Sequence, residues 1–413
     1  MKSYLDLVPQ YEKVHRKQSK MSRICIILAV FLVAVMFGLA DMYLQGITQK
    51  VMQENGDWHY QITFIDTKTS DLIAARPEVE VSGWHSTLSA DAGYSISGQP
   101  IAISGLDEDV FGEIYLASLA EGKYPNAANE IAVSSVLKES NDLDLGSVID
   151  LTCPDGSTVS FSIVGFFDNP EKARLIAGSE QSVILAQEGF TTFISASNSP
   201  ASEKYIIQLS QHCDMSSTIE KIKSQYSLSD GQIEANMNLL NIEGQLAGKT
   251  GVNQIYSIAL ILSIIVMLTC ILMISSTLNS NVTQRTEFFG MLRCLGATKK
   301  QIMNFVRLEG LYWCKTAIPA GVALSIVVVW VTSAAMRKIS PQWFAYMPTW
   351  GISWISIAVS VLLGLLTVLL AARAPAKKAA KSSPLEAVSG NAQQTTMFRK
   401  AANTSFFKIE TAM

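Results

Sequence analysis

The sequence predicts a membrane protein, an α-helical bundle of four transmembrane spans with a large extracytoplasmic α+β domain between spans 1 and 2. Of its 413 residues, 49% are hydrophobic and only 16% are charged, whereas ordinary soluble domains are about 25% charged. The apolar residues also gather in four long runs, one near the N-terminus and three in the second half of the chain. Composition and clustering together favour a protein that crosses a bilayer several times.

Each apolar run is long enough, or nearly so, to cross a bilayer as a helix, which takes about 20 residues. No charged residue lies within 24–40, 255–278, 316–336 or 350–372. The first run is not followed by the small-residue cleavage site of a signal peptide. We therefore expect spans at 24–44, 251–278, 311–336 and 350–372, joined by a cytosolic loop at 279–310 and an outer loop at 337–349.

Lysine and arginine residues give the expected orientation. They are concentrated in the N-terminal segment 1–23, in the loop 279–310 and in the tail 373–413. Such residues next to spans stay on the cytoplasmic side, so we expect both termini inside and residues 45–250 outside. Residues 1–23 have the apolar and basic pattern of an interfacial amphipathic helix, and 397–413 look similar.

Residues 45–250 are too many for a loop and enough for a folded domain with its own core. They carry 11 Lys and Arg against 28 Asp and Glu, which argues against nucleic acid as a partner. A helix is expected at 216–226, capped by Ser216 or Ser217. Pro154-Asp155-Gly156 predicts a hairpin turn. Short β-branched and aromatic runs predict strands at 59–64, 131–134, 148–151, 159–164 and 205–209.

Six cysteines and four histidines are scattered along the chain without a recognisable metal-binding or redox spacing. Only Cys153 and Cys213 are expected to face outward. One disulfide between them and two unpaired thiols remain equally open interpretations. We expect no metal site.

No catalytic motif stands out. Gly244 to Thr250, GQLAGKT, resembles a phosphate-binding loop but has three residues between Gly and Gly-Lys where four are needed. No hydrolase or kinase motif is present, and no ionisable residue lies in the middle of a span, as a proton relay would require. The chain is therefore not expected to be an enzyme, and any energy it uses should come from a partner.

The stretch from Arg285 to Gln301, RTEFFGMLRCLGATKKQ, lies between spans 2 and 3. A helix ended by Gly296 and restarted by Thr298 would make a compact elbow. Its charged residues would be able to pair with a soluble partner, although basic residues at a span end also serve simply as anchors at lipid headgroups. The Gly-Ala-Thr sequence between two helical halves favours the elbow.

This cytosolic stretch, continuing through Ile302 to Glu309, resembles the signature of FtsX-like, MacB-type permeases of ABC transporters. The order of spans and outer domain is also similar. Ser383-Pro384-Leu385-Glu386-Ala387 resembles the closing motif of that family. In the outer domain, a run resembles the MacB-like periplasmic core domain, with Lys123 where the family has Arg: Glu121-Gly122-Lys123-Tyr124-Pro125, then Asn129-Glu130-Ile131 and Gly146.

The resemblance implies a permease of the bacterial plasma (inner) membrane. It implies docking to ABC ATP-binding subunits, which bind ATP and Mg²⁺ so that this chain needs no cofactor. It also implies a dimer with a second copy or a homologous permease, within membrane lipid. The positions that match the family's motifs and would take part are Arg285, Glu287, Gly290, Arg293, Gly296, Ala297, Thr298, Lys299, Lys300, Gln301 and Glu309, with Pro384 and Glu386 in the C-terminal motif.

Two functions follow from the resemblance. In the first, ATP hydrolysis by the partner moves the outer domain to export or extract peptides, lipids or other amphiphiles. In the alternative, the chain is a transmembrane signal transmitter that activates a cell-wall hydrolase or a sensor kinase without translocating a substrate. Longer members of the family have eight spans, so the chain is expected to be either half-sized or truncated.

Overall fold

The computed structural model describes residues 16–167, 169–197, 201–244 and 251–381. The chain divides into two compact units, residues 44–254, here called the head, and the remaining residues, here called the membrane unit. Three sequence predictions lie outside the described residues: most of the amphipathic segment 1–23, most of the GQLAGKT stretch, and the tail from 382 onward with Pro384 and Glu386.

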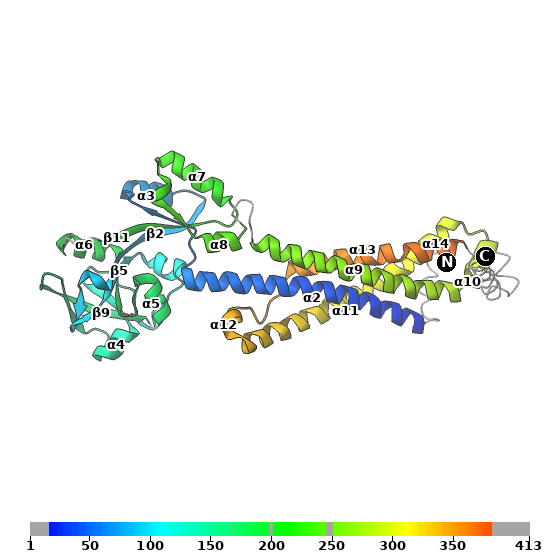
Figure 1. The fold of residues 1–413 in the computed structure, drawn as a ribbon, viewed down its shortest axis with the longest axis horizontal. Coiled ribbons are helices and arrows are strands. Elements are labelled where there is room, and N and C mark those ends of the chain that lie inside the picture. Colours follow the sequence, from blue (N-terminus) through cyan, green and yellow to red (C-terminus); the bar gives the residue numbers. More distant parts are fainter. Residues whose placement is uncertain (1–15, 168, 198–200, 245–250, 382–413) are drawn as a thin grey trace, which may run out of the picture. The chain divides into compact units, whose positions relative to one another are not determined.

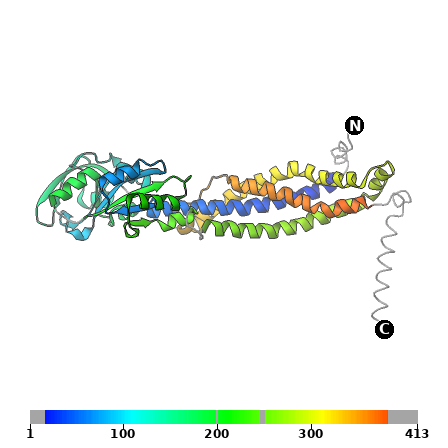
Figure 2. The ribbon, with the colours of Figure 1, turned by 90° about the horizontal axis from the view of Figure 1, so that it is seen from above.

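Four helices in the described part of the chain are long and apolar enough to cross a bilayer. Figures 1 and 2 show them lying side by side. They are α2 (Arg16–Asn55), α9 (Gly251–Gln284), α11 (Lys299–Ile339) and α13 (Trp354–Ala371). Three shorter helices accompany them, α10 (Thr286–Cys294), α12 (Pro341–Phe344) and α14 (Arg373–Ala380). The predicted four-span bundle is confirmed.

Several helices extend beyond the expected spans. Residues 16–23 belong to α2 and do not form a separate surface helix, because no glycine or proline lies between Arg16 and the first span. The boundary between the two units falls inside α2, after Tyr43. Most of the expected loop 279–310 is helical as well, since only residues 295–298 separate α10 from α11.

Small residues let the membrane helices approach closely. A Cβ on Gly321 would lie 2.9 Å from the carbonyl oxygen of Ile27, and one on Gly364 would lie 2.6 Å from Cγ2 of Val30. The hydroxyl of Ser356 donates to the carbonyl of Ala34 at 2.7 Å. Since lipid gives no hydrophobic drive between helices, such close packing and hydrogen bonding holds them together.

The head is built on one sheet with strand order β12-β1-β11-β2-β5-β10-β7-β9-β8-β3-β4, in which β6 pairs with β9. Among the described strands, only the β5–β10 and β7–β9 pairs are parallel. The strands are β1 (Tyr60–Thr63), β2 (Val79–Leu88), β3 (Ser95–Ile96), β4 (Gln99–Pro100), β5 (Ala102–Leu106), β6 (Glu121–Gly122), β7 (Glu130–Ser134), β8 (Val148–Thr152), β9 (Thr158–Phe167), β10 (Ser182–Ala186), β11 (Ser202–Leu209) and β12 (Ile233–Ala235).

The five predicted strands correspond to β1, β7, β8, β9 and β11, and the predicted hairpin turn joins β8 to β9. Strands β2, β5 and β10 were not predicted, and neither were the short strands β3, β4, β6 and β12. Glycine weakens the strand pattern of β2 and β5. It is required there because a Cβ would lie 2.6 Å from Val110 at Gly83 and 2.2 Å from Phe190 at Gly105.

Helices pack on the sheet of the head and close its cores. The predicted helix at 216–226 is α7, and its cap is Asp214 rather than Ser216 or Ser217, since the Asp214 carboxylate accepts the Ser217 N–H at 3.1 Å. The helices are α3 (Thr67–Ala74), α4 (Ser135–Asn141), α5 (Pro170–Ala177), α6 (Gln187–Ser197), α7 (Met215–Tyr226) and α8 (Met237–Ile242), with single turns at Ala90–Ala92, Val110–Ile114 and Asp230–Gln232.

The two outer-domain segments quoted above meet in the head. Lys123 donates to Glu130 at 3.0 Å, so the lysine found in place of arginine still forms an ion pair. The other carboxylate oxygen of Glu130 accepts the backbone N–H of Asn126 at 2.9 Å, and these bonds lower the pKa of Glu130 to about 2. Gly122 has φ +84°, and a Cβ there would lie 2.1 Å from the Val164 carbonyl.

The disulfide that was left open is not formed. Cys153 is buried among Leu151, Phe161 and other residues of one core. Cys213 packs at the edge of a different core and its thiol donates to the carbonyl of Ser210 at 3.1 Å. Since the two thiols belong to separate hydrophobic clusters, no bond joins them.

Candidate coupling site

The elbow between α10 and α11, here residues 295–298, is closed on its α10 side by a Schellman motif. Gly296 has φ +94°, the left-handed conformation that favours glycine. Its N–H donates to the Arg293 carbonyl at 3.1 Å, and the Ala297 N–H donates to the Leu292 carbonyl at 3.0 Å. These two bonds satisfy the last carbonyls of α10 and fix the direction in which the chain leaves it.

On the α11 side, a capping box starts the next helix immediately. The Thr298 hydroxyl accepts the Gln301 N–H at 3.3 Å, and the Gln301 side-chain oxygen accepts the Thr298 N–H at 2.8 Å. Both bonds occupy donors that would otherwise be unpaired at a helix start. The predicted helix–Gly–helix turn is therefore confirmed, and its geometry is held from both sides.

Aromatic and alanine side chains form a hydrophobic cluster that packs against the elbow. The rings of Phe288, Phe289 and Phe305 lie with centroids 5.6–6.3 Å apart. Ala376 and Ala379 of α14 pack against the same cluster, and Lys378 of α14 donates to the Thr283 hydroxyl at 2.8 Å. The helix after the last span thus packs against α10 and α11, a contact that no local sequence pattern predicted.

A buried ion pair joins Arg285, the residue just before α10, to Glu309 of α11. Arg285 Nη1 donates to Glu309 Oε1 at 2.7 Å, with side chains only 5% and 8% exposed. Arg285, which was expected to be able to pair with a partner's charges, thus forms a buried ion pair within the chain. Both residues instead fix how α10 leaves α9, since an unpaired charge in such a buried place would be costly.

The outward surface of the elbow is apolar at its centre and charged around it. Leu295 is 84% exposed and Met291 is exposed beside it. A cavity of about 260 Å³ opens next to them, lined by Leu292, Leu295, Gly296, Ala297, Gln301, Ile302 and Phe305. Glu287, Lys299 and Lys300 are exposed, and Arg293 is half-buried.

The predicted positions therefore fall into two groups. Gly290, Arg285 and Glu309 are buried and shape the elbow, while Glu287, Gly296, Thr298, Lys299, Lys300 and Gln301 lie on its surface, and Arg293 and Ala297 are half-buried between the two groups. Leu295 was missing from the predicted set. The available signal was an apolar residue just before the helix-ending glycine, where the chain turns outward and side chains lose their helix neighbours.

The fold and the elbow define a multi-pass membrane protein that carries a folded α+β head between its first and second spans. Two family models match it. The FtsX-like permease C-terminal model matches residues 260–384, and the MacB-like periplasmic core domain model matches residues 22–225. The chain belongs to the FtsX-like, MacB-type permeases and is thus a permease subunit of an ABC transporter, a family that works with a separate ATP-binding subunit.

No curated protein matches the chain in sequence. Among solved structures, the periplasmic region of MacB from Actinobacillus actinomycetemcomitans is 10% identical, with TM-score 0.36, and covers 50% of this chain and 100% of its own. The extracellular domain of the ABC-type transporter YknZ from Gram-positive bacteria is 8% identical, with TM-score 0.31, covering 43% and 98%. A domain of a putative permease from Porphyromonas gingivalis is 10% identical, with TM-score 0.30, covering 44% and 87%. Because these scores are low, the family assignment depends on the family models.

Proposed function

We propose that this chain converts ATP hydrolysis in a separate ATP-binding subunit into movement of its head, and that the partner docks on the elbow. One observation carries the proposal. Leu295 is 84% exposed on a turn that two capping motifs hold rigid. An exposed apolar residue beside a cavity of about 260 Å³ is suited to burial against a partner. A turn with fixed geometry can transmit a displacement of the docked subunit to α10 and α11, whereas a flexible loop would deform instead.

The charges around Leu295 favour a protein partner over lipid alone. Glu287 lies in the first turn of α10 and Lys299 and Lys300 in the first turn of α11, so both signs of charge surround the apolar centre. An apolar centre with a charged rim is the usual arrangement of a protein interface. We propose that the rim sets the orientation of the docked subunit.

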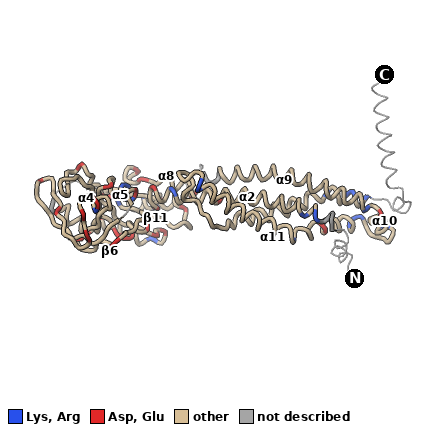
Figure 3. The backbone as a smooth tube through the Cα atoms, turned by 90° about the horizontal axis from the view of Figure 1, so that it is seen from below, with Lys and Arg blue, Asp and Glu red and all other residues tan. Residues whose placement is uncertain are grey.

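We place the elbow and both termini in the cytoplasm of a bacterium and the head on the outer side of its plasma membrane. Support comes from the distribution of charge. Figure 3 shows acidic residues concentrated in the head and basic residues near α10, as expected if basic segments stay inside. The exposed apolar side chains of the membrane helices, such as Leu272 and Leu362, would contact lipid or a second permease in a dimer.

In this proposal the chain is not itself catalytic and holds no cofactor, because ATP and Mg²⁺ bind to the partner. The cargo is proposed to be a peptide, lipid or other amphiphile handled at the outer face. The proposed class of cargo rests on the family to which the chain belongs.

A second candidate is a signal transmitter that activates a cell-wall hydrolase or a sensor kinase. The two cavities described in the head favour it. One, of about 350 Å³, is lined mostly by polar and charged residues such as Lys138, Asp142 and Asp144. The other, of about 150 Å³, is lined by apolar and polar residues such as Phe167 and Lys172, and it is smaller than the roughly 300–1,000 Å³ of most ligand-binding pockets.

Co-purification tests the proposed function. The full chain is extracted from its native membrane in mild detergent, and bound proteins are assayed for ATP hydrolysis. An ATPase that binds the wild-type chain is expected. Recovery of the chain without ATPase activity, under conditions in which other ABC transporters stay intact, would refute the proposal. Stimulation of that ATPase by added peptides or lipids would favour export, and its absence would favour the signal transmitter.

A further inference from the structure

The head receives the chain from α2 and returns it towards α9 through two neighbouring segments. The incoming segment is the end of α2 and residues 56–59, and the outgoing segment is α8 with Glu243. Both lie within the head unit. Their contacts with each other and with the sheet decide whether the head moves as one body when the membrane helices move.

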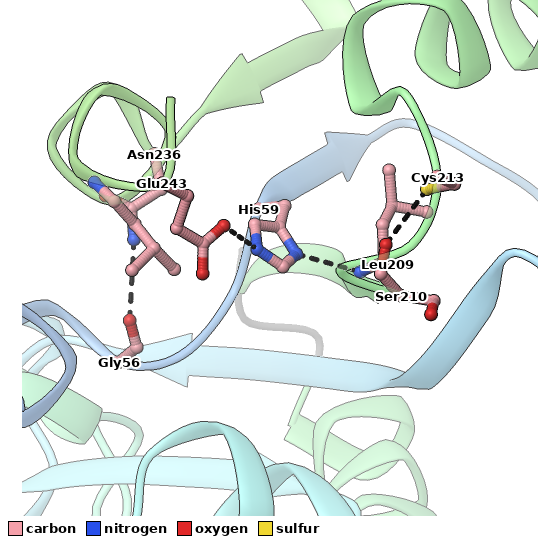
Figure 4. Close-up of polar contacts among 8 residues, drawn as sticks. Gly56, His59, Leu209, Ser210, Cys213, Asn236 and Glu243 are labelled. Atoms are coloured by element: carbon pink, nitrogen blue, oxygen red, sulfur yellow. Dashed lines mark hydrogen bonds and ion pairs between the residues drawn. The ribbon is translucent and has the colours of Figure 1, made fainter. Parts of the chain in front are cut away.

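His59 joins the two segments to each other and to β11 (Figure 4). Its Nε2 lies 2.9 Å from Glu243 Oε2, and its Nδ1 accepts the Leu209 N–H at 2.8 Å. Since Nδ1 accepts a hydrogen bond, the ring proton is on Nε2 and is donated to the carboxylate. The two side chains are only 2% and 11% exposed, so water competes little for this bond.

The backbone of His59 adds two further bonds. Its N–H donates to the Ile207 carbonyl at 3.0 Å, and its carbonyl accepts the Asn236 N–H at 2.9 Å. The Asn236 side chain caps α8 by accepting the Leu239 N–H and also reaches the Gly56 carbonyl at 3.4 Å. Residues about 180 positions apart in the sequence are thus bonded through both backbone and side chains.

A second contact holds the end of α2. The ammonium of Lys172, on α5, donates to the Gln53 carbonyl at 2.9 Å and to the Tyr115 carbonyl at 2.6 Å, and the residue is only 5% exposed. Trp58 Nε1 donates to the Asn55 carbonyl at 2.7 Å. A cation at the C-terminal end of a helix meets the negative end of its dipole, and burial lowers the pKa of Lys172.

A ligand-binding role fits these residues poorly. Metal coordination at His59 would need a free ring nitrogen, and both nitrogens are occupied by hydrogen bonds. In the described part of the chain no three His, Cys, Asp or Glu side chains are grouped to hold a metal ion. What the contacts provide is a mechanical connection at two separate points.

We propose that His59 and Lys172 are positioning residues of a two-point joint that makes the head follow its two connecting segments as one body. Lys172 fixes the end of α2 to α5, and His59 fixes the outgoing segment to the incoming one and to β11. The proposal rests on the proposed function, because a joint is needed only if the membrane helices drive the head.

The first experiment tests the joint without any partner. Hydrogen–deuterium exchange is measured on the full chain in lipid nanodiscs for Glu243→Ala and for the matched control Glu243→Gln, whose side-chain oxygen still accepts from His59 Nε2. The alanine variant is expected to speed exchange of peptides covering 236–243 about tenfold. The glutamine variant is expected to stay near wild type, and peptides covering β7 and β9 should be unchanged in both. Equal exchange in all three proteins would overturn the joint.

The second experiment tests transmission. The chain is reconstituted with its ATP-binding subunits, a fluorescent pair is placed on cysteines introduced at exposed Leu28 of α2 and Val148 of β8, and the ATP-dependent change in energy transfer is recorded. Glu243→Ala and Lys172→Met are each expected to reduce this change by more than half while ATP hydrolysis continues, and Glu243→Gln is expected to retain it.

The two experiments separate the two ideas. Full ATP-dependent movement in Glu243→Ala and Lys172→Met would overturn the joint and leave the proposed function standing. A wild-type complex that shows no movement with ATP would overturn the proposed function and with it the mechanical role of the joint. In that case the exchange result would still show whether His59 holds the two segments together.

Discussion

In the proposed function both the elbow and the joint of the head transmit movement, and the two are stabilised in different ways. The elbow is fixed by residues close in sequence, with Gly296 bonded back to Arg293 and Thr298 bonded forward to Gln301. The joint is fixed by distant residues, since His59 bonds to Leu209 and Glu243. The elbow also exposes an apolar surface, whereas the joint buries polar groups.

This difference shows which kinds of connection can be fixed by residues that are close in sequence. A turn that must present a surface to a partner can be built from capping motifs and remain exposed, because its backbone bonds do not depend on burial. A connection between two chain segments that enter one domain needs contacts across the fold. Buried hydrogen bonds serve there, because removing one partner leaves a desolvated group unsatisfied.

The largest expected effect comes from the buried ion pair between Arg285, at the start of α10, and Glu309 of α11. Arg285→Met leaves Glu309 buried and unpaired and should destabilise the protein by about 3–5 kcal/mol. The double variant Arg285→Met with Glu309→Leu removes both charges and should recover most of that loss. Thermal unfolding of the full chain in detergent measures both. If the double variant is as unstable as the single one, the buried pair is not what holds α10 to α11.

A paired comparison of helix caps comes next. Thr298→Ala removes a local cap at the elbow and should cost about 1 kcal/mol. Asn236→Ala removes the cap of α8 together with a buried bond to Gly56, so it should cost about 2–3 kcal/mol. The two costs are measured as losses in the free energy of unfolding. Denaturant titrations of each variant are followed by hydrogen–deuterium exchange of peptides from the membrane unit for Thr298→Ala and from the head for Asn236→Ala. Equal costs would show that the joint is no more dependent on distant contacts than the elbow.

The same contrast explains how much the sequence could predict. Gly296 and Thr298 carry their structural role in three consecutive residues, so the helix–turn–helix course of the elbow was predicted. The four apolar runs were equally direct, because span length is a property of continuous sequence. The Arg285–Glu309 pair was not predicted as a pair, although both residues were selected, since nothing in the sequence states that positions 24 apart meet.

The joint of the head was not predicted from the sequence at all. His59 was noted only as one of four scattered histidines, because its partners Leu209 and Glu243 become neighbours only when β11 and α8 close around it. Lys172 carried no signal either, since most lysines are exposed and only the fold reveals that this one is buried. Strands β2 and β5 were missed for a related reason, because glycines required by close packing weaken their strand pattern in the sequence.

Gly296 tests the conformation of the elbow. Gly296→Val forces a β-branched residue into the left-handed region and should cost about 1–2 kcal/mol locally. The expected result is continued ATP hydrolysis with reduced head movement, because the docked subunit then pushes on a turn of altered direction. Reversal of charge by Glu287→Arg with Arg293→Glu should act in the same direction through orientation of the partner. Full coupling in both variants would show that the elbow does not transmit force.

The smallest expected effect on stability accompanies a clear effect on binding. Leu295→Gln replaces an apolar side chain that is 84% exposed, so the free energy of unfolding should change by no more than about 0.5 kcal/mol. If the partner buries Leu295, its loss should weaken binding about tenfold or more, since truncation of a central interface residue costs about 2 kcal/mol. Ile339→Gln is the matched control, because Ile339 is 81% exposed and lies at the opposite end of α11. The amount of ATP-binding subunit that co-purifies with each variant is the measurement. Equal loss in both variants would point to a general defect of the protein, and no loss in either would move the docking surface away from the elbow.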